Sequence, residues 1–446
     1  LGASGDTVTL GSGASQSGFG RTGTVDWDTT AKTASFTAVS GDGYFVNTTS
    51  SAITVTLPAG SAGSIVSLKD YANTWDTNNV TVTPNGTDKI NGTNASATLN
   101  TEDQSVTLVY VDDTKGWRVV QDSTSSVDGA TYVAATGGTI TTSGDFKIHT
   151  FTGPGTFCVS SAGNSAGSNT VDYLVVAGGG GAGQSGGGNM GGGGGAGGYR
   201  ESSGAASGCY TVSPLGSCVA ALPVSVQGYP ITVGSGGTGN SGDTGSPPFP
   251  KGGAGNNSTF STITSAGGGG GGAGAPTSFP GSVTGNDGGS GGGGSGGHNV
   301  SPNDNTKGSG NTPPVSPPQG NPGGAGGGSP DQRAGGGGGA TTAGADRTPT
   351  ISGPGGTGGT SSINGTPTER AGGGGAGGGG SATAGTATGG GGAGGAAGSC
   401  GSNGTAGTDN TGGGGGAGGG ATSSPYNAGD SGAGGSGIVI IRYRFQ

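Results

Sequence analysis

Short alternations of apolar and polar residues fill the first part of the chain. Between residues 34 and 121 they read ASFTAV, GYFVN, AITVTLP, SIVSLKDY, NVTVTP, SVTLVYV and WRVVQD, with Gly, Pro, Asn and Asp between them. Alternation with period two and β-branched residues predicts strands, and no window repeats apolar residues at the spacing of a helix. The spacing of strands and turns therefore predicts an antiparallel, sandwich-like β module or barrel over residues 31–125.

Large aromatic residues in these strands are the candidates for the core of the module. We expect its anchors to be Trp75, Trp117, Tyr44, Phe45 and Tyr110. The sequence DDTKG between two apolar runs predicts a hairpin loop, with Gly116 at the position that needs a positive φ. Residues 1–30 mix Gly, Ser and Thr with short Val/Leu alternations, which predicts a β stalk or connector. They lack the basic and apolar regions of a signal peptide.

A second set of strands, TYVAAT, FKIHTFTGPGTFCV and VDYLVVA, lies in residues 126–177, and IVIIRYRFQ ends the chain at 438–446. Between them, over residues 178–437, the chain is rich in glycine. Ten glycine-rich runs cover residues 178–183, 191–198, 267–274, 288–297, 323–328, 335–340, 372–380, 389–395, 412–420 and 432–437.

Three interpretations of these runs compete. A flexible linker is the usual meaning of such a composition, because glycine loses the most backbone entropy on ordering. The similar run lengths and the non-repeating loops between them argue against a linker. Collagen requires glycine at every third position and abundant proline, and the runs have neither. The third interpretation is a bundle of extended helices with the polyproline II geometry, the polyglycine II form.

The third interpretation makes specific demands on the sequence. A polyproline II helix has three residues per turn and no internal hydrogen bonds, so its N–H and C=O groups must bond to neighbouring helices. A helix surrounded by others has no room for Cβ, so interior runs must be nearly pure glycine, with Ala or Ser only where a face is open. Runs such as GGGGAGGGG fit this pattern. Hydrophobic composition then no longer indicates whether the chain folds.

Loop lengths indicate which end of such a bundle each loop occupies, if consecutive runs alternate in direction. Loops after odd runs are short, and loops after even runs are longer. The odd loops are 184–190, 275–287, 329–334, 381–388 and 421–431, and the even loops are 199–266, 298–322, 341–371 and 396–411. The first and last apolar strands would meet at the end that carries the even loops. The five odd loops would lie at the opposite end.

Composition and charge narrow the class of protein. Of 446 residues, 119 are Gly and 22 are Pro, and only 27% are hydrophobic, which excludes an ordinary globular enzyme along the whole chain. The formal charge of −9 is the opposite of what binding to nucleic acid requires. No stretch approaches the roughly 20 apolar residues of a membrane span, so we expect a protein that is not embedded in a membrane.

No catalytic chemistry emerges from the motifs. Matches to GxGxxG are numerous, but the glycine content produces them by chance, and no GK[ST] completes a phosphate loop. His149 and His298 are the only histidines, and we expect His149 to be an ordinary sheet residue. We therefore expect no enzyme activity, no cofactor and no metal. Cys209 and Cys218 can either close a local disulfide or stay reduced.

The flanking strands together with the runs resemble a known family. VDYLVVAGGGGAG, GGGGGAGGYR, YPITVGSGG, TITSAGGGGGGAG and GGSGIVIIRYR are similar to the glycine-rich tip domains of bacteriophage tail fibre proteins, including the polyglycine-helix adhesins of T-even-like phages. The segment from GYFVNTTSS to GWRVV resembles a β-rich module of phage fibres. In the adhesins, alternate loops at the exposed tip carry host specificity, and the resemblance implies that role for the five odd loops. Unlike those adhesins, this chain joins stalk, module and tip in one polypeptide.

Six loop residues combine aromatic or planar groups with hydrogen-bonding groups. Such groups suit recognition of sugars or of outer-membrane loops, and the alternative is that they only anchor loops on the bundle. The candidate receptor-binding residues are Phe279, Asp331, Gln332, Arg333, Tyr426 and Asn427.

The leading hypothesis is a structural, extracellular fibre protein of a virion that acts as an adhesin for host attachment. We expect a homotrimer whose partners are other virion tail proteins and a bacterial surface receptor, either an outer-membrane protein or a polysaccharide. An alternative is a subunit of an extracellular filament or sheath. Ice binding is a third hypothesis, and the long even loops argue against it.

Overall fold

The computed structural model describes residues 25–123, 130–164, 167–186, 188–208, 210–242, 249–274, 283–297, 307–328, 332–422 and 427–446. The chain divides into two compact units, Leu1–Asp128 and Gly129–Gln446. In these described ranges the one helix is a single 3-10 turn, η1 (Pro214–Gly216), so the predicted all-β class without α-helix is confirmed. None of the described segments forms a helix long and apolar enough to cross a membrane.

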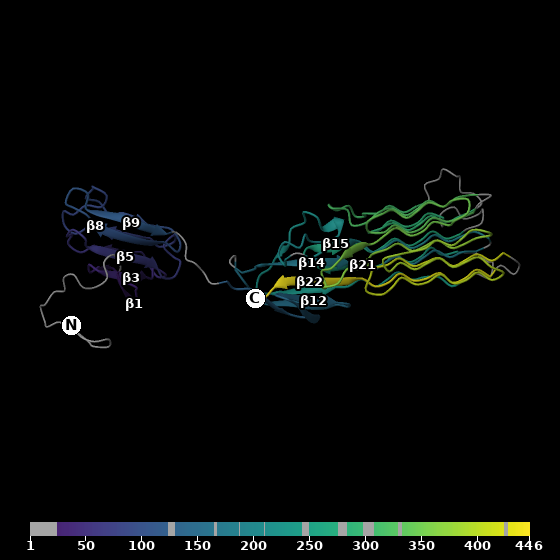
Figure 1. Ribbon diagram of the computed structural model, residues 1–446, viewed down its shortest axis with the longest axis horizontal. Helices are drawn as coiled ribbons and strands as arrows, with labels where there is room; N and C mark the ends of the chain where they lie inside the picture. The colour runs from purple at the N-terminus through teal and green to yellow at the C-terminus, as the bar shows by residue number, and fades with distance from the viewer. Residues whose placement is uncertain are drawn as a thin grey trace. The chain divides into compact units, whose positions relative to one another are not determined.

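The first unit consists of two sheets (Figure 1). One contains β1 (Asp26–Lys32), β3 (Asp42–Val46), β5 (Ile65–Asp70), β8 (Ser105–Tyr110) and β9 (Trp117–Ser123). The other contains β2 (Phe36–Thr37), β4 (Ile53–Thr56), β6 (Val80–Thr83) and β7 (Ala97–Leu99). Because β1 pairs with β3, residues 26–30 belong to this module and not to the predicted stalk. Residues 1–24 of that stalk lie outside the described residues.

Strand direction in this unit differs from the antiparallel prediction. From β1 to β6 the chain crosses from one sheet to the other at each step, so neighbours within a sheet run parallel: β1 with β3, β3 with β5, β2 with β4, and β4 with β6. Only the later pairs, β5 with β8, β8 with β9 and β6 with β7, are antiparallel. The alternation of apolar residues indicates which face of a strand is buried, and it is the same for either direction.

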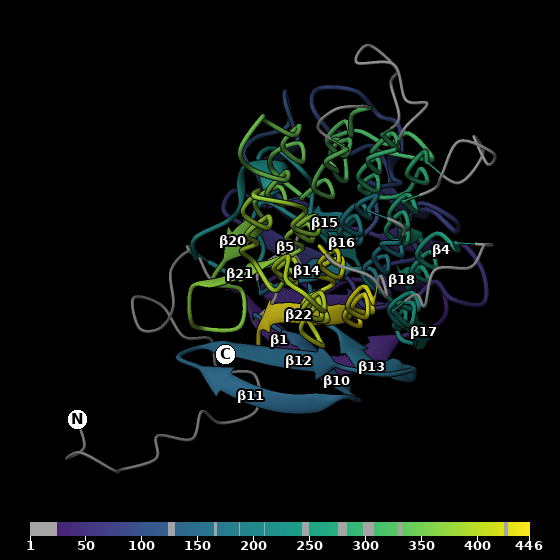
Figure 2. The ribbon, with the colours of Figure 1, turned by 90° about the vertical axis from the view of Figure 1, so that its right-hand side faces the viewer.

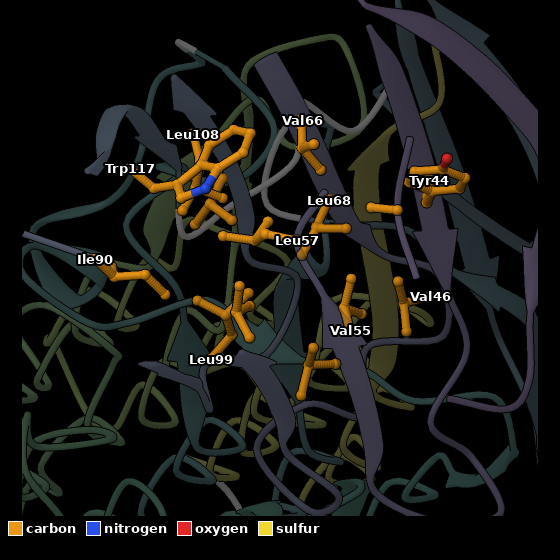
Figure 3. Packing of buried hydrophobic residues seen from close by; sticks show 14 of the residues in the cluster. Tyr44, Val46, Val55, Leu57, Val66, Leu68, Ile90, Leu99, Leu108 and Trp117 are labelled. Atoms are coloured by element: carbon orange, nitrogen blue, oxygen red, sulfur yellow. The ribbon is translucent and has the colours of Figure 1, made fainter. Parts of the chain in front are cut away.

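The core lies between the two sheets (Figure 3). Trp75 and Trp117 are fully buried and Tyr44 and Tyr110 nearly so, as predicted. The prediction for Phe45 is wrong: it is half-buried, and its ring centroid lies 5.0 Å from that of Trp27. Neighbouring residues on a strand point to opposite faces, so Tyr44 and Phe45 cannot both enter one core. The hairpin prediction is confirmed, with Gly116 at φ +68°.

Two sheets and a hairpin form one end of the second unit. The first sheet contains β11 (Thr139–Ser143), β12 (Phe146–Phe151), β22 (Ile438–Arg444), β14 (Thr170–Val176) and β15 (Tyr199–Glu201), and β16 (Leu222–Pro223) pairs with β14. The second contains β10 (Val133–Thr136), β13 (Gly155–Ala162), β17 (Gly228–Thr232), β18 (Ser258–Phe260) and β19 (Ile263–Ser265). The hairpin is β20 (Gly359–Ser361) and β21 (Thr368–Arg370). The last strand, β22, lies between β12 and β14 and is antiparallel to both.

His149 is a buried residue of β12, as predicted. Its Nδ1 lies 2.7 Å from the Gly137 carbonyl oxygen, and its Nε2 lies 3.1 Å from the Tyr443 hydroxyl. Burial lowers the pKa of this imidazole. The side chain therefore helps to join β12 to β22.

The glycine-rich segments are helices with three residues per turn. Along Gly178–Gly183 the N–H groups bond in turn to three neighbouring segments and return to the first after three residues. The donor–acceptor pairs are Gly178–Asn256, Gly181–Gly253, Gly179–Gly435, Ala182–Gly432, Gly180–Gly195 and Gly183–Gly192. This is the period of polyproline II, and the segments are visible as narrow coils in Figure 2. The carbonyl groups of Gly178, Gly179 and Gly180 accept bonds from three further segments, so this helix is surrounded.

The ten runs do not alternate in direction as predicted. Gly269 and Gly272 donate to Ser290 and Gly293, so both residue numbers rise together and the third and fourth runs are parallel. The seventh and eighth runs are parallel for the same reason. Shorter segments with fewer glycines lie between the runs in the sequence and supply the missing reversals of direction. Such additional segments are 234–240, 250–256, 283–286, 307–312, 342–347, 352–358, 383–387 and 401–408.

The composition of the additional segments explains why glycine counting missed them. In 401–408 the glycines are Gly401, Gly404 and Gly407, and the residues between them are exposed. A helix at the edge of the bundle turns only every third residue toward its neighbours, so glycine is needed only there. The even loops therefore contain helices of their own and are not loops of the sheet end alone.

Alanines in the runs are buried, although the sequence predicts them where a face of a helix is open. Ala182, Ala196 and Ala376 are fully buried. Ala376 packs with Ala334 and Met190 in a small apolar cluster. The bundle thus combines backbone hydrogen bonds with a few local side-chain contacts.

Replacing an interior glycine should prevent the second unit from folding. A Cβ at Gly375 would overlap the carbonyl oxygen of Gly385, a backbone atom that cannot move aside. We expect Gly375→Val to destabilise the unit by more than about 4 kcal/mol, enough to abolish its cooperative transition in calorimetry. Gly153→Val is the matched control, because a Cβ there meets nothing within 4 Å. Equal melting of the two variants would contradict the packed-helix description.

Candidate functional site at the far end of the bundle

Helical segments that leave β14 and β21 turn back at the end of the bundle away from the sheet (Figure 1). We call this end the far end. The described turns there include 184–186 with 188–190, 348–351, 380–382 and 397–400. The five runs that precede the odd loops all end at the far end. The additional segments bring further connections there, including 348–351.

The first of the odd loops, 184–190, is an interior element. Gln184, Ser185, Asn189 and Met190 are all buried. Ser185 Oγ donates to the Gly418 carbonyl oxygen at 2.6 Å and accepts from the Gly191 N–H at 2.8 Å. These described residues support the surrounding helices, so they are not available as a contact surface, contrary to the role implied for this loop.

Three of the six predicted contact residues, Phe279, Asp331 and Tyr426, lie outside the described residues. Their role stays a prediction. Asn427 is exposed, and its carbonyl oxygen accepts from the Gly401 N–H at 2.9 Å. Gln332 is half-buried with φ +39°, and its N–H donates to the Gly328 carbonyl oxygen at 3.1 Å.

Arg333 anchors a loop. Its side chain is buried, and Nη1 donates to the Thr348 carbonyl oxygen at 3.3 Å. Of the two interpretations of the loop residues, contact or anchoring, the structure favours anchoring for Arg333. The backbone carbonyl of Arg333 also accepts from the Gly327 N–H at 2.9 Å.

The loop that Arg333 holds was missed in the sequence because it lay inside a long even loop. Residues 348–351, Thr-Pro-Thr-Ile, are all exposed, and Ile351 is 42% exposed. Thr383 N–H donates to the Thr350 carbonyl oxygen at 3.1 Å, which joins this loop to the next turn. The far-end patch is defined here as Thr348, Thr350, Ile351, Ser381 and Thr383. A proline and β-branched residues between glycine-spaced segments were the available signal.

The far-end patch presents hydroxyl groups and one exposed isoleucine. Nearby carboxylates bond to the backbone: Asp346 Oδ1 accepts from the Ala325 N–H at 2.7 Å, and Asp430 accepts from the Gly242 N–H. Over the part of the chain that the structure describes, no three His, Cys, Asp or Glu side chains gather in a way that could hold a metal ion.

Toward the far end, the described basic groups are partly buried. Lys251 Nζ lies 3.4 Å from Asn286 Oδ1, and burial lowers the pKa of this lysine. Cys218, at the other end of the unit, is an exposed free cysteine with φ +64°. Cys209, the other cysteine of the possible local disulfide, lies outside the described residues, so nothing here decides between a disulfide and reduced thiols.

Comparison with known proteins shows which family the chain matches. A family model described as a glycine-rich domain matches residues 152–444. No curated protein matches the chain. The matched region begins in the strands of the second unit and ends in β22, so it includes both the sheet end and the bundle.

Removing the guanidinium of Arg333 should loosen the exposed loop without unfolding the bundle. We expect Arg333→Met to cost about 1–2 kcal/mol locally, because the Thr348 carbonyl loses its charged donor. Amide hydrogens of Thr348 and Ile351 should then exchange about tenfold faster or more. Arg200→Met is the control, since Arg200 Nη1 also contacts a carbonyl, that of Thr264 at 3.5 Å, at the sheet end. Unchanged exchange at residues 348–351 in Arg333→Met would rule out the anchoring role.

Proposed function

Because this chain belongs to the glycine-rich domain family, we propose that it is a fibre protein of a bacterial virus that attaches the virion to its host. The far end of the bundle binds the host surface in this proposal. The strand-rich first unit serves as a structural part of the fibre. The protein acts by adhesion and catalyses no reaction.

One observation carries the proposal: a scaffold held by backbone hydrogen bonds gathers many chain reversals at one end. Binding residues are found most often on loops that a rigid scaffold positions. The turn 348–351 is an example: neighbouring segments hold both of its ends, because Arg347 N–H donates to the Ala325 carbonyl oxygen before it and Ser352 N–H donates to the Thr383 carbonyl oxygen after it. Loop sequences can therefore vary without a change in the helices that carry them.

The residues at the far end suit a polar surface ligand. Exposed hydroxyls of Thr348, Thr350 and Thr383 can exchange hydrogen bonds with a polysaccharide or with loops of an outer-membrane protein. Ile351 adds an apolar contact. Phe279, Asp331, Tyr426 and Asn427 complete the proposed contact set. The resemblance to tail fibres further leads us to propose an extracellular, trimeric protein that joins other tail proteins of the virion.

Binding to whole cells tests the proposal. We expect the fluorescently labelled full chain to bind a few strains in a panel of bacteria. Replacing residues 348–351 with Gly-Ser-Gly-Ser should weaken that binding at least tenfold, about 1.4 kcal/mol, while the melting transition of the second unit stays in place. Replacing residues 112–115 in the first unit is the control of equal length, because that exposed hairpin turn lies outside the far end.

Two outcomes would count against attachment through the far end. Binding that survives replacement of the far-end turns would move the contact elsewhere on the chain. Absence of binding to every strain, by protein shown to be folded, would favour the filament or sheath hypothesis. Measurement of self-assembly by light scattering would then be the decisive experiment.

A further inference from the structure

A pocket of about 510 Å³ lies at the sheet end of the second unit, remote from the far end. Four chain segments meet there: the end of β11, the loop after β15, the β20–β21 hairpin and β22. Its lining residues are Ser143, Tyr210, Thr211, Ser362, Gly365 and Arg442. Thr211 N–H donates to Ser362 Oγ at 2.8 Å, and Ser362 N–H donates to the Thr211 carbonyl oxygen at 2.9 Å. Two of the walls are thus fixed to each other.

Arg442 of β22 is the one charged residue of this lining. Its side chain is only 5% exposed. The guanidinium carbon lies 4.6 Å from the centre of the Phe146 ring and 5.2 Å from that of Tyr210. Rings on both sides hold the guanidinium plane in one orientation, as cation–π contacts do.

Among the residues that the structure describes, none forms an ion pair with Arg442. Nη1 donates to the Ile363 carbonyl oxygen at a long 3.4 Å, and Nε is buried with no hydrogen-bond partner. In the described part of the chain the ion pairs join Lys32 to Asp28 and Lys69 to Asp103. A buried charge without a partner is costly, and proteins normally pair such a charge.

Asp172, directly opposite Arg442 in the sheet, already has its own partners. Its carboxylate oxygens accept from Ser202 Oγ at 2.7 Å, Gly204 N–H at 3.1 Å, and Ser207 N–H and Oγ at 2.7 and 2.5 Å. These four donors occupy both carboxylate oxygens of Asp172. Asp172 thus lowers the electrostatic cost of burying Arg442 from a distance but makes no hydrogen bond to it, and the Nε–H group of Arg442 keeps no acceptor among the described residues.

The Tyr210 ring that contacts the guanidinium carries a buried hydroxyl. Among the described residues this hydroxyl makes no hydrogen bond of ordinary geometry, and the nearby Ser202 hydroxyl only partly offsets the effect of burial on its pKa. Burial raises the pKa of this phenol well above its usual value, so it keeps its proton and donates. Ser143, Thr211 and Ser362 add hydroxyl groups around the same pocket.

We propose that this pocket binds an oxyanion, a carboxylate or phosphate group, through Arg442 and Tyr210. The planar fork of an arginine matches the two oxygens of such a group, and the Tyr210 hydroxyl supplies a further donor. The oxyanion can belong to an acidic sugar or be free in solution. This site is independent of the proposed attachment through the far end.

Calorimetric titration of the full chain tests the proposal, with sodium phosphate, acetate and D-glucuronate as probes and glucose as the neutral control. We expect saturable heat from the oxyanions at constant ionic strength and none from glucose. The second unit should melt about 2–4 °C higher at tenfold excess over the dissociation constant. The transition of the first unit is an internal control for the general effect of salts on stability. Preference for glucuronate over acetate assigns the oxyanion to a sugar, and equal binding of all three assigns it to a free anion.

Variants separate a binding site from a purely structural arginine. Arg442→Gln should abolish the titration heat, and Arg442→Lys, which keeps the charge but loses the fork, should weaken binding at least tenfold. Arg444→Gln is the matched control on the same strand, because Arg444 is exposed and lies over Tyr132 outside this pocket.

Because Arg442 is buried, its replacement can also unfold the protein, so the test needs a second variant. Ser143→Asp places a carboxylate of the chain itself at the pocket edge, where it should compete with added oxyanions and remove their heat while the protein stays folded. No saturable heat from the wild-type protein would overturn the proposal. Heat that persists in both Arg442→Gln and Ser143→Asp would do so as well.

Discussion

Hydrogen bonds between neighbouring backbones hold the second unit together, and they require that the helices come close enough for N–H and C=O groups to meet. A polyproline II helix has no hydrogen bonds of its own, so each polar group of an interior segment depends on another segment. A side chain at Gly375 or Gly193 would strike a carbonyl group of the next helix. The high glycine content is therefore a condition for folding here, although in most chains it indicates disorder.

This dependence explains why the bundle begins and ends in a conventional β-sheet. Glycine segments have almost no side chains to set their register, and each glycine loses much conformational entropy when it is fixed. The strands β14 and β22 pair over five residue pairs and pack large apolar side chains on both faces. The first and last helices thus leave the sheet at defined positions, and the remaining segments align against them.

Sequence reasoning predicted the composition of the helices better than their number and direction. Pure glycine runs identify surrounded helices, because only glycine fits there. Edge segments such as 401–408 carry glycine only at every third residue, which is a weaker signal than an unbroken glycine run. In the first unit the error was of another kind: the alternation around Tyr44 identifies a buried face, but the same pattern fits a parallel or an antiparallel neighbour. Direction followed from the chain crossing between two sheets, which local sequence does not encode.

At the candidate site, too, the sequence predicted one property, the end of the bundle at which turns lie, better than another, their exposure. The odd runs all end at the far end even though consecutive runs do not alternate in direction, because the additional segments restore an up-and-down path. What the sequence could not indicate is which turns face outward. Residues 184–190 turn back beneath their neighbours and are buried, whereas residues 348–351 lie on the surface. Whether a turn at the end of the bundle is buried depends on how far the surrounding segments extend beyond it. A central turn is therefore covered by its neighbours, whereas a peripheral turn forms part of the surface. Residues that contact a ligand at the far end should therefore lie in the peripheral turns. The helices that lead to these turns need glycine only at every third position.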